Sequence, residues 1–99
     1  HCTQCRKQSG HHWASGYGDI ESFEITGDVR WFAASETSKR GFCPRCGYFL
    51  FWKAHAEEGM SFSLGVIDGP TGLELQKHIF VADEGDYYKI ADDVPQREQ

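Results

Sequence analysis

Four cysteines in two pairs of identical spacing are the feature of this 99-residue chain that points most directly to chemistry. Cys2 and Cys5 form one C-x-x-C pair, and Cys43 and Cys46 form the other. Two intervening residues let both sulfurs of a pair reach one metal ion at about 2.3 Å from a tight turn, whose backbone N–H groups can donate to the thiolates. Gly47, directly after the second pair, suits a turn that needs a positive φ. The spacing therefore predicts that all four cysteines are zinc ligands.

Two other interpretations of the pairs agree less well with their setting. A redox-active pair of the thioredoxin type should open a helix after a βαβ-like strand, whereas Cys43 and Cys46 lie between two predicted strands. Cysteines are also often buried as inert core residues, but all four would then not be expected in C-x-x-C pairs. On spacing alone, the two pairs satisfy one tetrahedral structural site with four thiolates, which would make the chain a non-catalytic zinc module for protein binding.

The elements that must position these cysteines are predicted to be short antiparallel strands separated by glycine turns. Residues 20–25 and 29–32 have the pattern of a hairpin, and residues 60–66 alternate with period two. An aromatic run at 48–52 indicates a buried strand. The remaining predicted strands are shorter and lie at 73–75, 78–81 and 87–90, and a single helical turn is predicted to end at Ser9 and Gly10.

These elements predict a mainly β fold: an open barrel or sandwich of antiparallel strands with a zinc knuckle and at most one or two short helices. A chain of 99 residues is the usual size of one domain, so a single zinc-binding domain over residues 1–99 is expected. Aromatic residues make up 14% of the chain, which argues against disorder.

The charge balance excludes some classes of partner. Fifteen acidic residues outnumber ten basic ones, and a formal charge of −5 repels phosphate backbones, so no nucleic-acid partner is predicted. No apolar run approaches the roughly 20 residues that a membrane span needs, so no membrane association and a cytoplasmic location are expected. Because the sequence starts at His1 and not at Met, we also expect that N-terminal strands of the native protein precede it.

Four segments occur in an order that is typical of one known family. They are residues 1–10 (HCTQCRKQSG), 42–47 (FCPRCG), 65–70 (GVIDGP) and 78–80 (HIF). In this order they resemble the glutathione-dependent formaldehyde-activating enzyme family, and the similarity extends to about residue 95. The two cysteine segments are fairly specific, and the other two are supportive.

The resemblance implies a β-tent fold with two zinc ions, one held by four cysteines and one held by three with an open position. Cys2 and Cys5 match the last two ligands of the C-x-C-x-x-C segment at the open site. Cys43 and Cys46 match half of the four-cysteine structural site. The ligands that complete both sites are expected in the segment before His1.

The resemblance also implies a zinc-dependent carbon–sulfur lyase, which forms or breaks a thiol–aldehyde adduct such as S-hydroxymethylglutathione. The implied partners are a small glutathione-like thiol and an aldehyde, and the implied catalytic segment contains Cys2 and Cys5. Arg6 and Lys7 lie beside that segment, and their charge alone suggests that they attract the carboxylates of glutathione. An ordinary solvated basic pair is the more common explanation of such residues.

Histidines near the first cysteine pair have two interpretations. His1, His11 and His12 could act as ligands or proton shuttles, although their polar neighbours favour simple exposure. His78 precedes an apolar run, which favours a packed, hydrogen-bonded histidine. A protein resembling methionine sulfoxide reductases is a further possibility for two C-x-x-C pairs, but that chemistry needs another cysteine, and the chain has only four.

Overall fold

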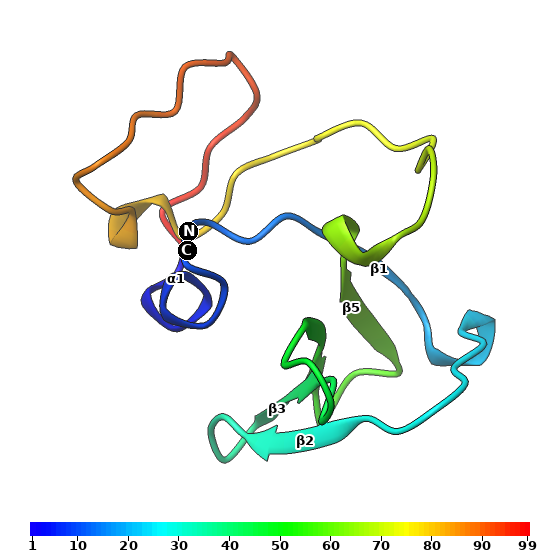
Figure 1. The fold of residues 1–99 in the computed structure, drawn as a ribbon. Coiled ribbons are helices and arrows are strands. Elements are labelled where there is room, and N and C mark those ends of the chain that lie inside the picture. The colour runs from blue at the N-terminus through cyan, green and yellow to red at the C-terminus, as the bar shows by residue number, and fades with distance from the viewer. The chain divides into compact units, whose positions relative to one another are not determined.

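The computed structural model describes residues 1–99, which form two compact units. The sheet unit comprises Ala14–Gly69, and the helical unit comprises His1–Trp13 with Pro70–Gln99. The elements, drawn in Figure 1, are α1 (Thr3–Ser9), β1 (Ser15–Asp19), β2 (Arg30–Ala33), β3 (Ser38–Phe42), β4 (Phe49–Ala54), β5 (Gly59–Ser63) and the 3₁₀ helices η1 (Ile20–Ser22), η2 (Leu64–Val66) and η3 (Val81–Asp83). None of the helices has the length and apolar composition of a transmembrane span.

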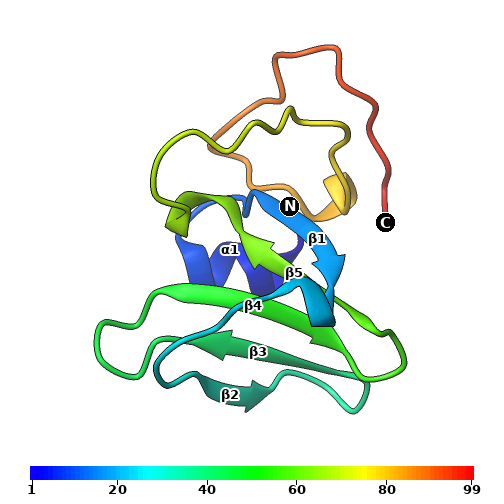
Figure 2. The same ribbon diagram turned by 90° about the vertical axis from the view of Figure 1, so that its right-hand side faces the viewer.

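The sheet unit is one open, antiparallel sheet with the strand order β1-β5-β4-β3-β2, which can be followed in Figure 2. Strands β1 and β2 are its two edges, so the sheet does not close into a barrel. The prediction of a mainly β fold with open, antiparallel strands and a short helix is confirmed. A single domain over residues 1–99 stays a prediction.

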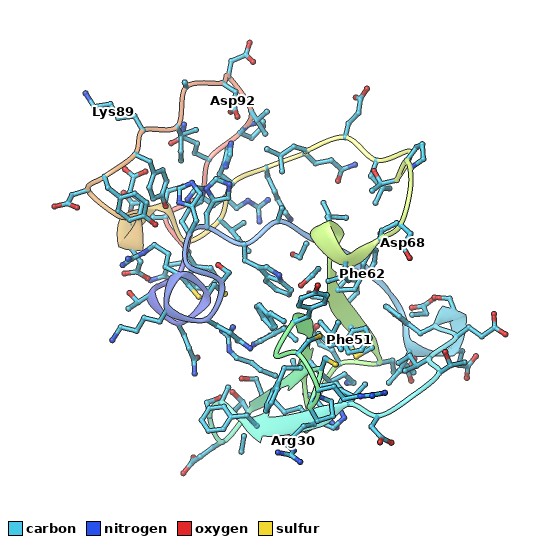
Figure 3. The ribbon with its side chains drawn as sticks, in the orientation of Figure 1. Arg30, Phe51, Phe62, Asp68, Lys89 and Asp92 are labelled. Carbon is cyan, nitrogen blue, oxygen red and sulfur yellow. The ribbon has the colours of Figure 1, made fainter.

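A row of aromatic and glycine residues crosses the whole sheet and explains how its strands pack. Gly16 pairs with Phe62, Phe62 with Phe51, Phe51 with Gly41, and Gly41 with Trp31. The neighbouring Phe51 and Phe62 are labelled in Figure 3. Each glycine leaves space that a ring fills, since a Cβ on Gly16 would lie 2.4 Å from Cζ of Phe62 and one on Gly41 would lie 3.0 Å from Cζ3 of Trp31. Ring contact across strands is a main source of sheet stability.

The predicted hairpin of residues 20–25 with 29–32 is wrong. Residues 20–22 form η1, and β2 pairs with β3 instead. Ile20 and Ile25 are exposed, and only Phe23 turns to the sheet, where its ring meets those of Phe51 and Phe62 edge-on. The apparent alternation in this segment therefore reflects one packed phenylalanine and no paired strand.

Strands β4 and β5 confirm the predictions at 48–52 and 60–66, although residues 64–66 continue as η2 rather than as strand. Strand β3 was not predicted, because its sequence Ser–Lys–Arg–Gly–Phe lacks an apolar pattern. It is nevertheless central, and Ser38 and Arg40 within it are buried. Arg40 lies over the ring of Phe49, and Phe49 and Met60 are the buried apolar residues.

The helical unit contains α1 and a long irregular segment. The predicted helical turn is confirmed: α1 ends at Ser9 and is capped by Gly10, which has a φ of 85° and donates its N–H to the carbonyl of Arg6. The strands predicted at 73–75, 78–81 and 87–90 are wrong, because Leu73 and Leu75 are exposed and the only β pairing is a single parallel bridge between His78 and Gln96.

Candidate functional site

The second cysteine pair lies in the tight turn that joins β3 to β4. The backbone N–H of Cys43 donates to the carbonyl of Tyr48 (2.9 Å), and the N–H of Gly47 donates to the carbonyl of Cys43 (2.8 Å). Gly47 has a φ of 78°, as its position after the cysteine pair predicts. The local sequence thus closes the hairpin with Cys43 and Cys46 in one turn, and both are free thiols.

The electrostatics of this turn favour a thiolate at Cys43. Hydrogen bonds from the backbone N–H groups of Arg45 and Cys46 lower the pKa of the Cys43 thiol, and the side chain of Cys46 and the charge of Arg45 lower it further. Partial desolvation opposes these effects; it is smaller than each hydrogen-bond contribution but larger than the charge effect of Arg45. Because thiolates are the form that binds zinc, this turn fits as two of the ligands of a zinc site.

The first cysteine pair lies at the start of α1. Cys2 is the N-cap residue, and its sulfur accepts a hydrogen bond from the backbone N–H of Cys5 at 3.3 Å. The N–H of Arg6 donates to the carbonyl of Cys2 (3.0 Å), which begins the helical hydrogen-bond ladder. One helical turn therefore places both half-buried cysteines at the same end of α1.

The basic residues after Cys5 differ in their surroundings. Nε of Arg6 donates to the carbonyl of Asp83 at 3.0 Å, so one of its donors is engaged within the helical unit. Lys7 is exposed. Both belong to the last turns of α1, where positive charge also stabilises the helix dipole. Their contribution to substrate binding stays a prediction.

A cluster of imidazole and phenol rings surrounds His1, and spacing alone did not predict it. Nδ1 of His1 lies 2.6 Å from the hydroxyl of Tyr88, and Nε2 of His1 lies 2.9 Å from Nδ1 of His78. Nε2 of His78 in turn lies 3.0 Å from both carboxylate oxygens of Asp92. His1 precedes His78 by 77 residues and Tyr88 by 87, and no local pattern in the sequence marks these residues or Asp92 as members of one cluster.

Two of the three remaining histidines, His11 and His12, lie beside this cluster. Nδ1 of His11 is 3.0 Å from the hydroxyl of Tyr87. The centroids of the His11 and His12 rings are 4.1 Å apart. Partial desolvation lowers the pKa of His12, and electrostatic repulsion from His11, from the N-terminal amine and from His78 lowers it further. The expectation of a packed, hydrogen-bonded His78 agrees with the structure, whereas His1 is buried rather than exposed.

Each predicted cysteine pair is brought together at one turn, but the two pairs belong to different units. Neither unit groups three or more His, Cys, Asp or Glu side chains in a way that could hold a metal ion. Zinc binding by all four cysteines, and the assignment of Cys2 and Cys5 to a catalytic segment, stay predictions.

Comparison with known proteins connects this geometry to a family. No curated protein matches the chain. The model of the glutathione-dependent formaldehyde-activating enzyme family matches residues 1–83, a range that includes both cysteine pairs, α1 and all five strands. The chain therefore belongs to the glutathione-dependent formaldehyde-activating enzyme family.

Proposed function

We propose that this chain is a zinc-dependent enzyme that forms or breaks the carbon–sulfur bond of a thiol–aldehyde adduct such as S-hydroxymethylglutathione. The observation that carries the proposal is the family match over residues 1–83, since membership suggests a formaldehyde-activating function related to glutathione. The two cysteine turns described above support it, because both lie within the matched range.

The donor set of the chain suits zinc. Cys43 has a lowered pKa and receives backbone hydrogen bonds, and the sulfur of Cys2 accepts one from the N–H of Cys5. Such N–H groups reduce the cost of gathering negative charge on sulfur ligands. We therefore expect Cys43 and Cys46 to hold a structural ion, and Cys2 and Cys5 to contribute to a second ion with an open position.

Cys2 and Cys5 would help to hold a zinc ion with an open position, and such an ion would lower the pKa of a substrate thiol so that a thiolate is available near neutral pH. In the reaction, the thiol sulfur attacks the aldehyde carbon and a carbon–sulfur bond forms. The π electrons of the carbonyl move to its oxygen, which takes up the proton that the thiol loses. Arg6 and Lys7 would attract the carboxylates of a glutathione-like thiol to α1, with Arg6 already oriented by its hydrogen bond to Asp83.

Exchange spectroscopy of the glutathione–formaldehyde equilibrium tests the proposal. The native protein should raise the exchange rate above that of the spontaneous reaction, and Cys5→Ser should abolish the increase. Gln4→Ala is the matched control, because Gln4 is an exposed residue of the same helical turn. Equal exchange rates with and without protein would reject the proposed reaction.

The zinc content of the native protein separates this enzyme from the non-catalytic zinc module. Two zinc ions per chain support the enzyme, because it needs a structural ion and a catalytic one. One ion per chain, together with no effect on adduct exchange, would instead support a module that binds protein partners through a single four-cysteine site.

A further inference from the structure

A chain of hydrogen bonds runs through the helical unit from Tyr88 through His1 and His78 to Asp92. Its members lie outside the cysteine turns, and its inner member, His1, is only 9% exposed. Asp92, labelled in Figure 3, is the outer end of this hydrogen-bond chain, and its side chain is 44% exposed.

When both imidazoles are neutral, the carboxylate of Asp92 fixes the direction of every bond in this hydrogen-bond chain. An ionised carboxylate only accepts hydrogen bonds, so Nε2 of His78 must carry the proton and donate to it. In a neutral imidazole the second ring nitrogen is a hydrogen-bond acceptor. Nδ1 of His78 therefore accepts a hydrogen bond from the N–H at Nε2 of His1. Nδ1 of His1 consequently accepts from the hydroxyl of Tyr88. One carboxylate therefore sets the tautomers and orientations of both rings.

The orientation of His1 matters because His1 is bonded directly to Cys2. The N-terminal amine of His1 donates to the carbonyl of Ile79 at 3.1 Å, so the main chain is anchored as well as the ring. Cys2 follows as the N-cap of α1, with its sulfur accepting from Cys5. Anchoring His1 on three sides thus restricts where the Cys2 sulfur can lie.

Asp92 and His78, in the outer part of the hydrogen-bond chain, are held in place by further hydrogen bonds. Asp92 accepts the N–H of Val94 at 3.1 Å, and His78 exchanges backbone hydrogen bonds of 2.8 Å with Pro95 and Arg97. Tyr88 and Asp92 lie beyond residue 83, where the family match ends. The C-terminal segment therefore supplies contacts that the family match does not cover.

We propose that His78 and Asp92 are positioning residues for the Cys2 and Cys5 thiols, acting through the ring of His1. The inference rests on the proposed function in that these thiols are taken as metal ligands. Groups hydrogen-bonded directly to a metal ligand commonly change metal affinity 10- to 100-fold when they are lost. His78 and Asp92 act through His1, so their loss should have a smaller effect. The same constraint acts on the cysteines before any metal binds, which provides a second, metal-independent measurement.

The first experiment measures cadmium binding by ¹¹³Cd NMR, with the resonance of the Cys2–Cys5 segment identified by its loss in Cys5→Ser. Asp92→Ala should shift this resonance and weaken cadmium binding by up to about 10-fold, without changing the resonance that depends on Cys46. Asp92→Asn should restore much of the affinity, because its amide oxygen still accepts from His78. Asp93→Ala is the matched control, an exposed neighbouring carboxylate whose loss removes the same charge.

The second experiment follows alkylation of each cysteine in the metal-free protein by mass spectrometry. Asp92→Ala should raise the alkylation rate of Cys2 several-fold relative to Asp93→Ala and leave Cys43 and Cys46 unchanged. Equal rates at Cys2 in the two variants would overturn the inference. A uniform rise at all four cysteines would overturn it too, because that result reports unfolding rather than repositioning.

The outcomes also separate this inference from the proposed function. A selective change at Cys2 in Asp92→Ala, in a protein that does not accelerate adduct exchange, would retain the positioning role and reject the reaction. Accelerated exchange that is the same in Asp92→Ala and Asp93→Ala, with equal alkylation at Cys2, would retain the reaction and reject the positioning role.

Discussion

The Cys43 thiol shows how a tight turn can change the chemistry of one side chain. Its pKa is lowered chiefly by the backbone N–H groups of Arg45 and Cys46, which favour the thiolate. Turns of this kind stabilise sulfur ligands before a metal arrives. The same hydrogen bonds should make Cys43 reactive in the metal-free protein.

We predict that Cys43 reacts with iodoacetamide at a lower pH than an unperturbed cysteine. The thiolate is the reactive form, its fraction rises with pH, and a lowered pKa moves that rise below the ordinary value of 9.0. Measuring the alkylation rate of Cys43 against pH in metal-free protein gives the midpoint directly. Arg45→Gln should move the midpoint upward only slightly, since the charge of Arg45 is the smallest contribution. A midpoint at or above 9.0 in the native sequence would contradict the assigned hydrogen bonds.

His12 gives a second residue-scale prediction, on the acid side of neutrality. Its folded pKa is lowered from 6.5 by partial desolvation and by His11 and His78. The unfolded state therefore binds more protons, so the stability present above pH 6.5 is lost as the pH falls through the folded pKa. His12→Gln should reduce the loss of thermal stability between neutral and mildly acidic pH. The effect is small, because His12 is exposed and water screens the repulsion.

Thermal melts of His12→Gln and the native protein across this pH range measure that difference. His55→Gln is the matched control, since His55 is an exposed histidine of the sheet unit. An acid-induced loss that is unchanged in His12→Gln would show that the ring cluster around His11 and His78 does not repel a charge at this position.

At the scale of elements, the row of glycine and aromatic residues across the sheet leaves little space for a side chain at the glycine positions. A Cβ on Gly16 would lie 2.4 Å from the ring of Phe62, whereas one on Gly18 in the same strand would lie 3.4 Å from its nearest neighbour, the Ser22 hydroxyl. Neither glycine has a positive φ, so only the space differs. We predict that Gly16→Ala destabilises the sheet unit by about 1–3 kcal/mol through overpacking, and that Gly18→Ala costs clearly less.

Urea unfolding of the two variants provides the comparison. The midpoint should fall in Gly16→Ala while the slope stays constant, which indicates a change in stability and not in the unfolded state. If both alanine variants unfold at the same urea concentration, the Phe62 ring has room to move, and the row across the sheet is less tightly packed than the structure indicates.

The elements also show what the sequence can and cannot predict. Strands β4 and β5 could be predicted because the aromatic run of β4 and the alternating apolar residues of β5 are patterns typical of buried strands. Strand β3 was not predicted, since its burial of Ser38 and Arg40 depends on neighbours on both sides rather than on its own residues. The cysteine turn was predictable because spacing and Gly47 act locally.

The ring cluster around His1 was beyond such prediction for the opposite reason. His1 meets Tyr88 and His78 only after the chain returns from the C-terminal segment. Its polar neighbours in sequence suggested exposure, but long-range hydrogen bonds satisfy both ring nitrogens and permit burial. Residues that position a site are thus harder to predict from a sequence than its reactive residues.

For the whole molecule, the small apolar core makes metal binding a question of stability as well as chemistry. Phe49 and Met60 are the buried apolar residues, while many large apolar side chains stay exposed. A domain of this size has little surplus hydrophobic stabilisation, and a metal that binds only the folded state adds its binding free energy to folding. The position of each cysteine pair should therefore decide how much stability it controls.

Our last prediction is that Cys43→Ser lowers the melting temperature of the zinc-loaded protein more than Cys5→Ser does. Cys43 closes the turn between β3 and β4, two inner strands of the sheet, so loss of a ligand there releases the hairpin around which the sheet unit is built. Cys5 lies on the short α1 of the other unit, where no strand depends on it.

Calorimetry of the zinc-loaded and chelated proteins measures both effects. We expect a loss of about 5 °C or more for Cys43→Ser, since 1 kcal/mol corresponds to about 4–8 °C in a domain of this size. Chelation should bring the native protein close to the Cys43→Ser melting temperature, because both then lack the ion at the hairpin. Gln4→Ala controls for substitution in α1 without loss of a thiol. Equal losses in Cys43→Ser and Cys5→Ser would mean that the two pairs share one ion, which would replace the two-site arrangement with a single structural site and remove the open position that catalysis requires.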